Sequence, residues 1–194
     1  MAWQDEREVR ADLIADMRSV AICRLGAVAG ESLVRVAGRA RPREELLTAP
    51  FSATACLAWA VELYFDDDPK LERDERVVAT FLLESEGENG AAVIVPPVPI
   101  LALVSERLVL DDAVEPLPPV AREWIDEHYS GDWSEARVRL VERRVEPGDR
   151  IAVVGWARTE YDDERVRYHA ANELVLFADA EGAPLSISDD ASLF

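Results

Sequence analysis

The sequence predicts a β-dominated α+β fold: a small barrel- or sandwich-like antiparallel β-domain with an N-terminal amphipathic helix and one mid-chain helix. Apolar residues recur at helical spacing near the start of the chain and again after a proline-rich segment, whereas most other segments alternate between apolar and polar residues and end in turn residues. The 194 residues can form a single domain, 1–194, or two β-rich lobes, 21–112 and 119–194, joined by the proline-rich segment 113–119.

Two helices are predicted. The first runs from Asp5 to about Val20, where four apolar residues share one face: Val9, Leu13, Ile14 and Met17. Because its polar face is mixed and acidic, packing on its own domain is favoured over binding to a membrane or partner. The second begins at Pro119, which fits a first helical turn because that turn needs no N–H there, and ends near Ser130-Gly131. Its predicted inner face contains Val120, Trp124, Ile125 and His128.

Strands are predicted wherever apolar and polar residues alternate with a period of two. In the first half of the chain they are 33–40, 54–65, 77–83, 91–95 and 105–110. In the second half they are 138–145, 150–157, 165–170, 173–177 and 184–188. Asn89-Gly90 predicts a hairpin between two of the early strands. The long strand 54–65 is predicted to place Cys56 and Ala58 on one face and Leu57 and Trp59 on the other.

The charge of the chain narrows the classes of partner. Thirty-nine acidic and 21 basic side chains give a formal net charge of −18, which disfavours nucleic acid and anionic membrane surfaces. No apolar run approaches the roughly 18 to 20 residues of a membrane-spanning helix, so no membrane span is predicted. The start of the chain lacks the pattern of a secretory signal. The two cysteines, Cys23 and Cys56, are therefore predicted to be buried, reduced thiols of a cytoplasmic protein.

Glycines occur in two related stretches, LVRVAGRA (33–40) and VEPGDRIAVVGWA (145–157). Pro147, Gly148 and Asp149 predict a turn. Gly38 and Gly155 lie inside predicted strands, where glycine indicates a bulge, a sharp bend or a close approach of another backbone. Neither belongs to a glycine-rich loop that opens a helix, so these glycines are predicted to be scaffold and not a phosphate cradle.

The order of the segments resembles the GIDE domain family, which includes the soluble domain of the mitochondrial ubiquitin ligase Mulan and many bacterial relatives. Five stretches match in order: LVRVAGRARP (33–42), LLTAPFSATACLAWAVELY (46–64), VVATFLLESEGENGAAVIV (77–95), RLVERRVEPGDRIAVVGWA (139–157) and APLSISD (183–189). The matching motif positions are Gly38, Pro50, Phe51, Ser52, Cys56, Glu142, Pro147, Gly148, Asp149 and Gly155. The resemblance implies a β-rich recognition or regulatory domain that acts beside a membrane.

The chain departs from Mulan in two respects. A RING module needs about eight Cys and His ligands for two zinc ions, and this chain has two of each. Ubiquitin ligase activity is therefore not expected. The membrane helices that usually flank the family's domain are also missing, which indicates a soluble relative or the soluble part of a longer protein.

One group of residues is compatible with acid–base or metal chemistry. His169 has Glu173 four residues on and Asp163 behind it across a turn. A strand histidine with solvated neighbours is the favoured interpretation. The acidic runs 66–68 and 111–112 lack the pattern of a calcium loop, and there is no G-x-S-x-G. No catalytic residue, metal ion or cofactor is therefore predicted.

The sequence thus predicts a non-enzymatic protein-binding, adaptor or regulatory domain with an unidentified protein partner. Four tryptophans are available to the core or to an interface: Trp59, Trp124, Trp133 and Trp156. Two alternatives stay open. One is a metal-dependent or acid–base hydrolase centred on His169. The other is a structural subunit of a larger assembly, which would form a homo-oligomer.

Overall fold

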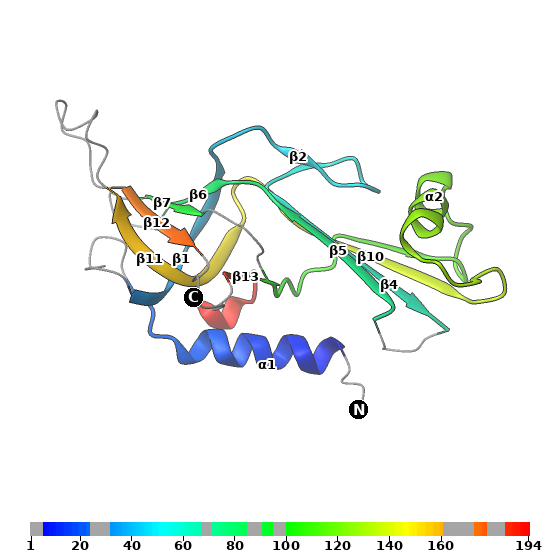
Figure 1. The fold of residues 1–194 in the computed structure, drawn as a ribbon, viewed down its shortest axis with the longest axis horizontal. Coiled ribbons are helices and arrows are strands. Elements are labelled where there is room, and N and C mark those ends of the chain that lie inside the picture. The colour runs from blue at the N-terminus through cyan, green and yellow to red at the C-terminus, as the bar shows by residue number, and fades with distance from the viewer. Residues whose placement is uncertain are drawn as a thin grey trace.

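The computed structural model describes residues 6–23, 32–66, 71–84, 91–94, 100–160, 173–177 and 185–194. It has the β-dominated α+β fold that the sequence predicts (Figure 1). The described α-helices are α1 (Glu6–Ser19) and α2 (Pro119–His128), and a 3-10 turn, η3 (Ala191–Leu193), lies near the C-terminus. Within this described part of the chain, neither helix is long and apolar enough to cross a lipid bilayer.

The larger sheet has seven strands and is strongly curled. Its order is β1 (Ser32–Pro42), β6 (Phe81–Glu84), β7 (Ala91–Ile94), β12 (Glu173–Phe177), β11 (Arg150–Glu160), β13 (Ser186–Ser188) and β8 (Ile100–Leu101). β1 also pairs with β11, so the sheet folds back on itself. β6 and β7 pair in antiparallel fashion, as the predicted hairpin requires, while Asn89-Gly90 lies outside the described residues. Two pairs, β7–β12 and β8–β13, are parallel and depart from the predicted antiparallel arrangement.

The smaller sheet is antiparallel and has four strands. Its order is β5 (Arg73–Val78), β4 (Ala58–Phe65), β10 (Val138–Val145) and β9 (Leu108–Asp111). A short hairpin of β2 (Leu47–Thr48) and β3 (Ala55–Cys56) lies beside it (Figure 1). Both the seven-stranded and the four-stranded sheet combine strands from before and after segment 113–119, since β1 pairs with β11 and β4 pairs with β10. The two sheets therefore do not follow the division into 21–112 and 119–194.

Two predicted strands are each divided in the structure. The predicted strand 77–83 is two strands, because β5 ends in the smaller sheet and β6 begins in the larger one. The predicted strand 54–65 breaks at Leu57, whose N–H donates to the Val145 carbonyl. The break shifts the alternation: Leu57 and Ala58 share one apolar cluster, while Cys56 and Trp59 share another. The faces predicted for these four residues are therefore wrong.

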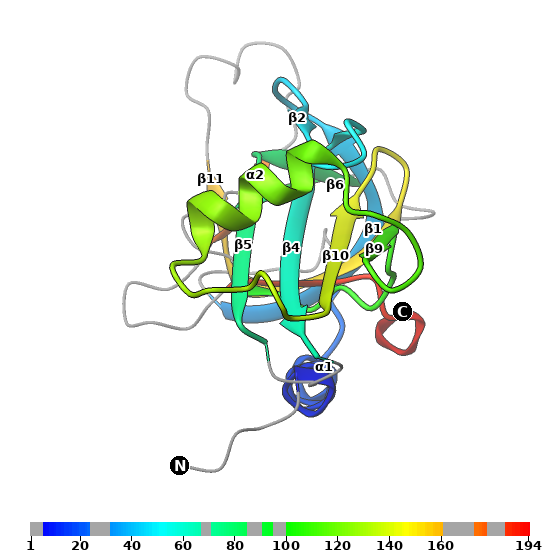
Figure 2. The same cartoon turned by 90° about the vertical axis from the view of Figure 1, so that its right-hand side faces the viewer.

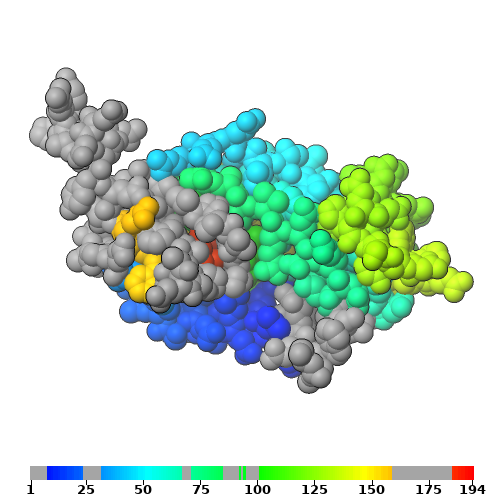
Figure 3. All heavy atoms as spheres, in the orientation of Figure 1, coloured from blue at the N-terminus to red at the C-terminus, as the bar shows by residue number. Residues whose placement is uncertain are grey.

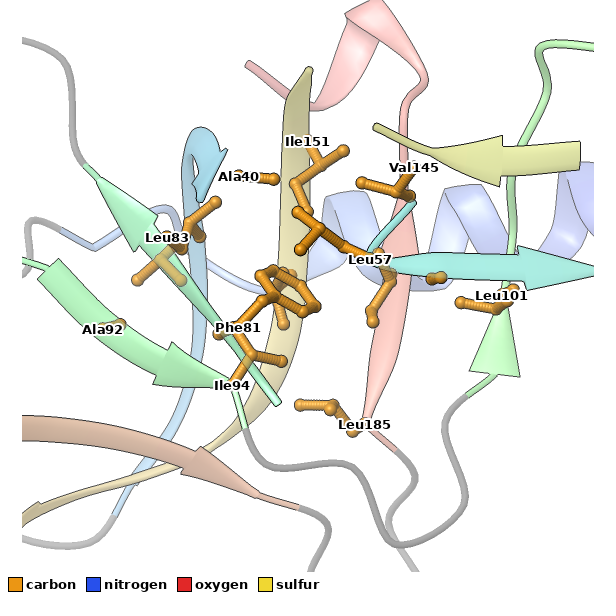
Figure 4. Close-up of a cluster of buried hydrophobic side chains, with 14 of the residues drawn as sticks. Ala40, Leu57, Phe81, Leu83, Ala92, Ile94, Leu101, Val145, Ile151 and Leu185 are labelled. Carbon is orange, nitrogen blue, oxygen red and sulfur yellow. The ribbon is translucent and has the colours of Figure 1, made fainter. Parts of the chain in front are cut away.

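The main apolar core lies inside the curl of the seven-stranded sheet (Figure 4). Phe81, Leu83 and Ile94 fill its centre and are fully buried. Leu57 and Val145 close it from the side of the smaller sheet. This shared core joins the two sheets.

Each helix covers one sheet. α1 packs against the larger sheet through Ile14 and Met17, as its predicted stripe indicates, although Val9 of the same stripe is exposed. α2 lies over the smaller sheet, with β5, β4 and β10 behind it in Figure 2. It ends at His128, two residues before the predicted end.

Gly38 is confirmed as a point of close backbone approach. A Cβ atom at this position would lie 2.8 Å from the Glu84 carbonyl carbon and would overlap its oxygen. Gly155 is buried and pairs with Val34 of β1. Gly148, in the predicted turn, has a φ of +95°, which L side chains rarely adopt. At Gly38 and Gly148 the backbone geometry itself therefore favours glycine.

We expect Gly38→Ala to lower the free energy of unfolding by about 1–3 kcal/mol, because the added methyl group meets backbone that cannot move aside. Chemical denaturation measures the change. Gly148→Ala is the comparison: no atom lies within 4 Å of its Cβ position, so only its backbone strain, about 1 kcal/mol, is expected. A Gly38→Ala protein as stable as the parent would contradict the close approach.

Candidate functional site

Residues on which the family resemblance depends come together around one buried carboxylate. Glu142 on β10 is 0% exposed. Its Oε2 accepts hydrogen bonds from the backbone N–H groups of Phe51 (2.9 Å) and Ser52 (3.1 Å), and Ser52 lies 90 residues away in the chain. The turn after Pro50 thus directs two successive N–H groups at one carboxylate. Successive N–H groups of this kind favour an anion.

Arg144 compensates the charge of Glu142. It lies two residues further along β10, on the same face of the sheet. Its Nη1 donates to Glu142 Oε1 (2.9 Å) and to Ser52 Oγ (3.3 Å), and its Nε donates to Glu146 Oε1 (2.8 Å). Both oxygens of Glu142 therefore have donors. A carboxylate in this state fixes the turn and is not a free general base.

The turn that Glu142 holds is conformationally costly. Ala53 has a φ of 52°, in the left-handed region that alanine rarely occupies. The turn is closed by hydrogen bonds between Ala49 N and Thr54 O (2.9 Å) and between Ala53 N and Ala49 O (3.1 Å). The bonds to Glu142 contribute to holding this backbone shape against its strain.

Cys56 lies near Glu142, and its thiol is unreactive at neutral pH. Its thiol is buried, and its pKa is raised from 9.0 to about 11, mainly by burial and also by the negative charges of Glu142 and Glu146, while Arg144 lowers it. At neutral pH the sulfur is therefore protonated, and a protonated thiol is neither a nucleophile nor a metal ligand. Neither cysteine forms a disulfide, as predicted, but Cys23 is only half-buried.

The predicted Pro147-Gly148-Asp149 turn ties three parts of the chain together. Gly148 N donates to Ala40 O (2.8 Å), and Ala40 N donates to Asp149 O (2.9 Å). Asp149 Oδ2 accepts from Glu146 N (2.8 Å) and from Arg107 Nη2 (2.8 Å). The turn anchors the β10–β11 connection to the end of β1.

The opposite face of β10 carries a second buried ionic cluster, which the sequence does not predict. Arg143 Nε donates to both oxygens of Glu62 on β4 (3.1 and 3.2 Å). Glu62 also accepts from Arg10 of α1 (2.5 Å) and from the hydroxyl of Tyr64 (2.9 Å). The Glu62 and Arg143 side chains are 6% and 5% exposed. This cluster connects α1 to the smaller sheet.

His169 and Asp163 lie outside the described residues, and the side chain of Glu173, at the start of β12, is not described either. In the ranges that the structure describes, no group of three or more His, Cys, Asp or Glu side chains is arranged to hold a metal ion.

Aromatic side chains fix α2 on the smaller sheet. The indole Nε1 of Trp124 donates to Glu75 Oε2 of β5 (3.0 Å), and the Trp124 ring stacks on His128 with 4.5 Å between centroids. His128 Nε2 lies 3.3 Å from Glu75 Oε2, and its Nδ1 lies 2.8 Å from Trp124 O. Phe51, from the turn held by Glu142, meets Trp124 edge-on at 5.9 Å. The turn held by Glu142 is therefore in contact with α2.

The outer side of α2 is largely exposed; there, Trp133 Nε1 donates to Asp126 Oδ1 (3.0 Å). The buried residues of the helix are Ala121, Trp124 and Ile125, so the predicted inward position of Val120 is wrong. Val120 is 44% exposed, and Val114, in the segment before the helix, is 82% exposed. We define the exposed residues of 113–127 as the α2 surface. It lies at one end of the molecule (Figure 3).

No family model, curated protein or solved structure matches this chain.

We expect Cys56 to resist thiol reagents near pH 8 in the folded protein and to react in denaturant, when Cys23→Ser leaves it as the only thiol. The pKa of Cys56 is higher in the folded protein than in the unfolded chain. The contribution of its protonated thiol to the free energy of unfolding is therefore complete below pH 9.0 and is lost as pH rises through about 11. The loss is at most about 3 kcal/mol. Denaturation of the parent and of Cys56→Ala from pH 8 to 11 measures it, and identical pH profiles would contradict the assignment.

We expect Arg143→Met to lower the free energy of unfolding by about 3 kcal/mol, because it leaves the buried Glu62 with less compensation. Adding Glu62→Leu should restore at least half of the loss, since no uncompensated carboxylate then remains at this position. Arg41→Met is the control: it removes an ion pair with Glu84 that is 49% exposed on both sides and should cost less than about 1 kcal/mol. Equal losses for the two arginines would contradict the role of burial.

Proposed function

We propose that this chain is a GIDE-like, non-enzymatic domain that binds a protein partner as an adaptor or regulatory module. One observation supports the family part of the proposal. Phe51, Ser52, Cys56 and Glu142 match the family motif in two separate stretches, and they lie together around the buried carboxylate of Glu142. A chance resemblance of alternating strands gives no reason for these positions to meet.

The chemistry of this cluster favours binding over catalysis. The carboxylate of Glu142 receives donors on both oxygens, and the raised pKa of Cys56 keeps its thiol neutral. A catalytic nucleophile or general base needs the opposite: a lowered pKa or a free lone pair near the substrate. These motif residues are therefore suited to hold a shape.

The α2 surface is our candidate for the contact with the partner. Val120 is exposed on a helix that is fixed from behind by Trp124, and Val114 is exposed in the segment before that helix. Half-buried aromatic side chains, Tyr129 and Trp133, lie just beyond its end. Protein interfaces are enriched in aromatic residues on rigid elements, where little conformational entropy is lost on binding. The two free cysteines agree with a reducing, cytoplasmic location.

We expect a photo-reactive amino acid at Val120 to crosslink a discrete protein in the native host. The same residue at Ala11, exposed on α1, is the matched control and should not give that product. Excess unlabelled protein should suppress the crosslink, and the Val120→Ser protein should suppress it less. Identical products from both positions, or none from Val120 in a protein of unchanged stability, would contradict binding at the α2 surface.

A further inference from the structure

The outer face of the β1–β11 pair is basic, although the chain as a whole is acidic. Residues of the pair point alternately inward, to the main core, and outward. The middle of the outward side is covered by α1, which packs on Ala152 and Val154. We define the β1–β11 outer face by its eight outward residues, of which three are arginines and none is acidic: Leu33, Arg35, Ala37, Arg39, Arg150, Ala152, Val154 and Trp156.

Two side chains of this face carry buried N–H groups without an acceptor. Arg35 Nε and Trp156 Nε1 are buried, and neither has a hydrogen-bond partner among the described residues. Trp156 pairs with Leu33, which lies two residues before Arg35 on β1. Arg35 and Trp156 are therefore diagonal neighbours on one face, a spacing that long side chains can bridge. Because a buried donor without an acceptor is unfavourable, two neighbouring ones indicate an acceptor from outside the chain.

The charge of Arg35 specifies that acceptor. Its Nη1 donates to the carbonyl oxygen of Met17 in the last turn of α1 (3.3 Å), and no carboxylate of the described residues forms an ion pair with it. Arg143 and Arg144 of β10, by contrast, each pair with a carboxylate. A carboxylate can accept from a guanidinium and an indole N–H at once, and charge-assisted hydrogen bonds are stronger than neutral ones. The two donors thus favour a carboxylate.

Exposed apolar side chains lie beside these donors. Leu33 is 43% exposed, and Ile22, just after α1, is 54% exposed. Ile22 forms an isolated parallel β-bridge with Arg35, and bridge partners point to the same side of a sheet. Leu33 lies on this side too, opposite Trp156. Tryptophan and arginine beside apolar side chains that exclude water are typical of the residues that dominate affinity in protein interfaces.

We infer that the β1–β11 outer face binds a second element of the partner protein, an acidic side chain that is flanked by an apolar one. The inference rests on the proposed function and adds a contact area at the other end of the molecule from α2 (Figure 1). The carboxylate accepts from Arg35 Nε and Trp156 Nε1, while the apolar side chain covers Leu33 and Ile22. Both donor side chains are only half-buried, so a change of rotamer can turn their N–H groups toward the partner.

Other anions fit this face less well. Nucleic acids and anionic membranes present many phosphates, which the net charge of −18 repels. A second copy of the chain has 39 acidic side chains but the same net charge, so two copies also repel each other. A single carboxylate on a partner of low net charge escapes most of this repulsion, because salt screens charges more than roughly 8 Å apart while a contact pair with Arg35 persists.

The test uses the full chain and a short labelled peptide in which glutamate is flanked by leucines, with a glutamine-for-glutamate peptide as the matched probe. We expect the parent to bind the glutamate peptide about three- to tenfold more tightly than the glutamine peptide. Arg35→Met should reduce this ratio to below about twofold, and Trp156→Phe, which keeps an aromatic ring, should reduce it in part. Arg41→Met is the control and should leave the ratio unchanged, because Arg41 already pairs with Glu84. Fluorescence anisotropy gives the dissociation constants.

The indole N–H of Trp156 provides a second readout. Its ¹H–¹⁵N resonance, assigned by its loss in Trp156→Phe, should move downfield with the glutamate peptide and less with the glutamine peptide. The indoles of Trp124 and Trp133 already donate to carboxylates and should not move. An unchanged Trp156 resonance would overturn the inference, because the donor would then take no part in binding. Equal effects of Arg35→Met and Arg41→Met would also overturn it, because net charge alone would then explain binding.

Further outcomes separate this inference from the proposed function. If the protein that is crosslinked from Val120 binds Arg35→Met as tightly as the parent, the outer-face site is wrong while the binding function stands. If Val120 gives no crosslink but both peptides behave as expected, the outer-face site stands and the contact at the α2 surface is wrong. Self-association of the chain that Arg35→Met abolishes would assign the face to a second copy and overturn the inference.

Discussion

The carboxylate of Glu142 is the interaction on which the family-motif region depends. A buried charge is strongly unfavourable unless donors compensate it, and here two backbone N–H groups and Arg144 do so. The donors come from a turn far away in the chain, so the carboxylate fixes that turn against β10. Phe51 of the same turn contacts Trp124, and this contact extends the constraint to α2. Removing the negative charge of Glu142 would therefore weaken the position of the turn after Pro50 first, and the packing of α2 on the smaller sheet next.

β10 carries ionic residues on both of its faces, because neighbouring residues of a strand point to opposite sides. Glu142 and Arg144 face the side covered by α2, and Arg143 between them faces Glu62 and α1. The strand thus joins both helices to the smaller sheet. The shared apolar core around Leu57 and Val145 joins that sheet to the larger one. Neither sheet can shift against the other without disturbing both the core and the ionic contacts.

Local patterns predict the local elements and leave the long-range contacts open. The α1 stripe, the Pro147-Gly148-Asp149 turn and the close approach at Gly38 depend on neighbouring residues or on one missing side chain, and the structure bears them out. The break at Leu57 could not be predicted, because it arises where the chain passes from one sheet to another. The parallel pairs β7–β12 and β8–β13 could not be predicted either, because each joins strands that are distant in the sequence. Glu62, an acid inside an apolar run, was the available signal for the Arg143 contact, but alternation does not identify its partner. The outward position of Val120 depends on how α2 rotates on its sheet, and a helical pattern defines that rotation only within about one residue, roughly 100°.

The buried ionic contacts distinguish scaffold from surface in this protein. Inside, each motif carboxylate has its donors in place, so binding a ligand there would require breaking favourable contacts first. On the outer side of α2, the side chain of Val120 is exposed to water, and a partner that covers it gains apolar burial without such a cost. Because α2 is held on the smaller sheet, less conformational entropy would be lost when its outer side is bound. The buried Glu142 network, through the contact of Phe51 with Trp124, thus helps to fix the position of α2, the helix that carries the proposed contact surface.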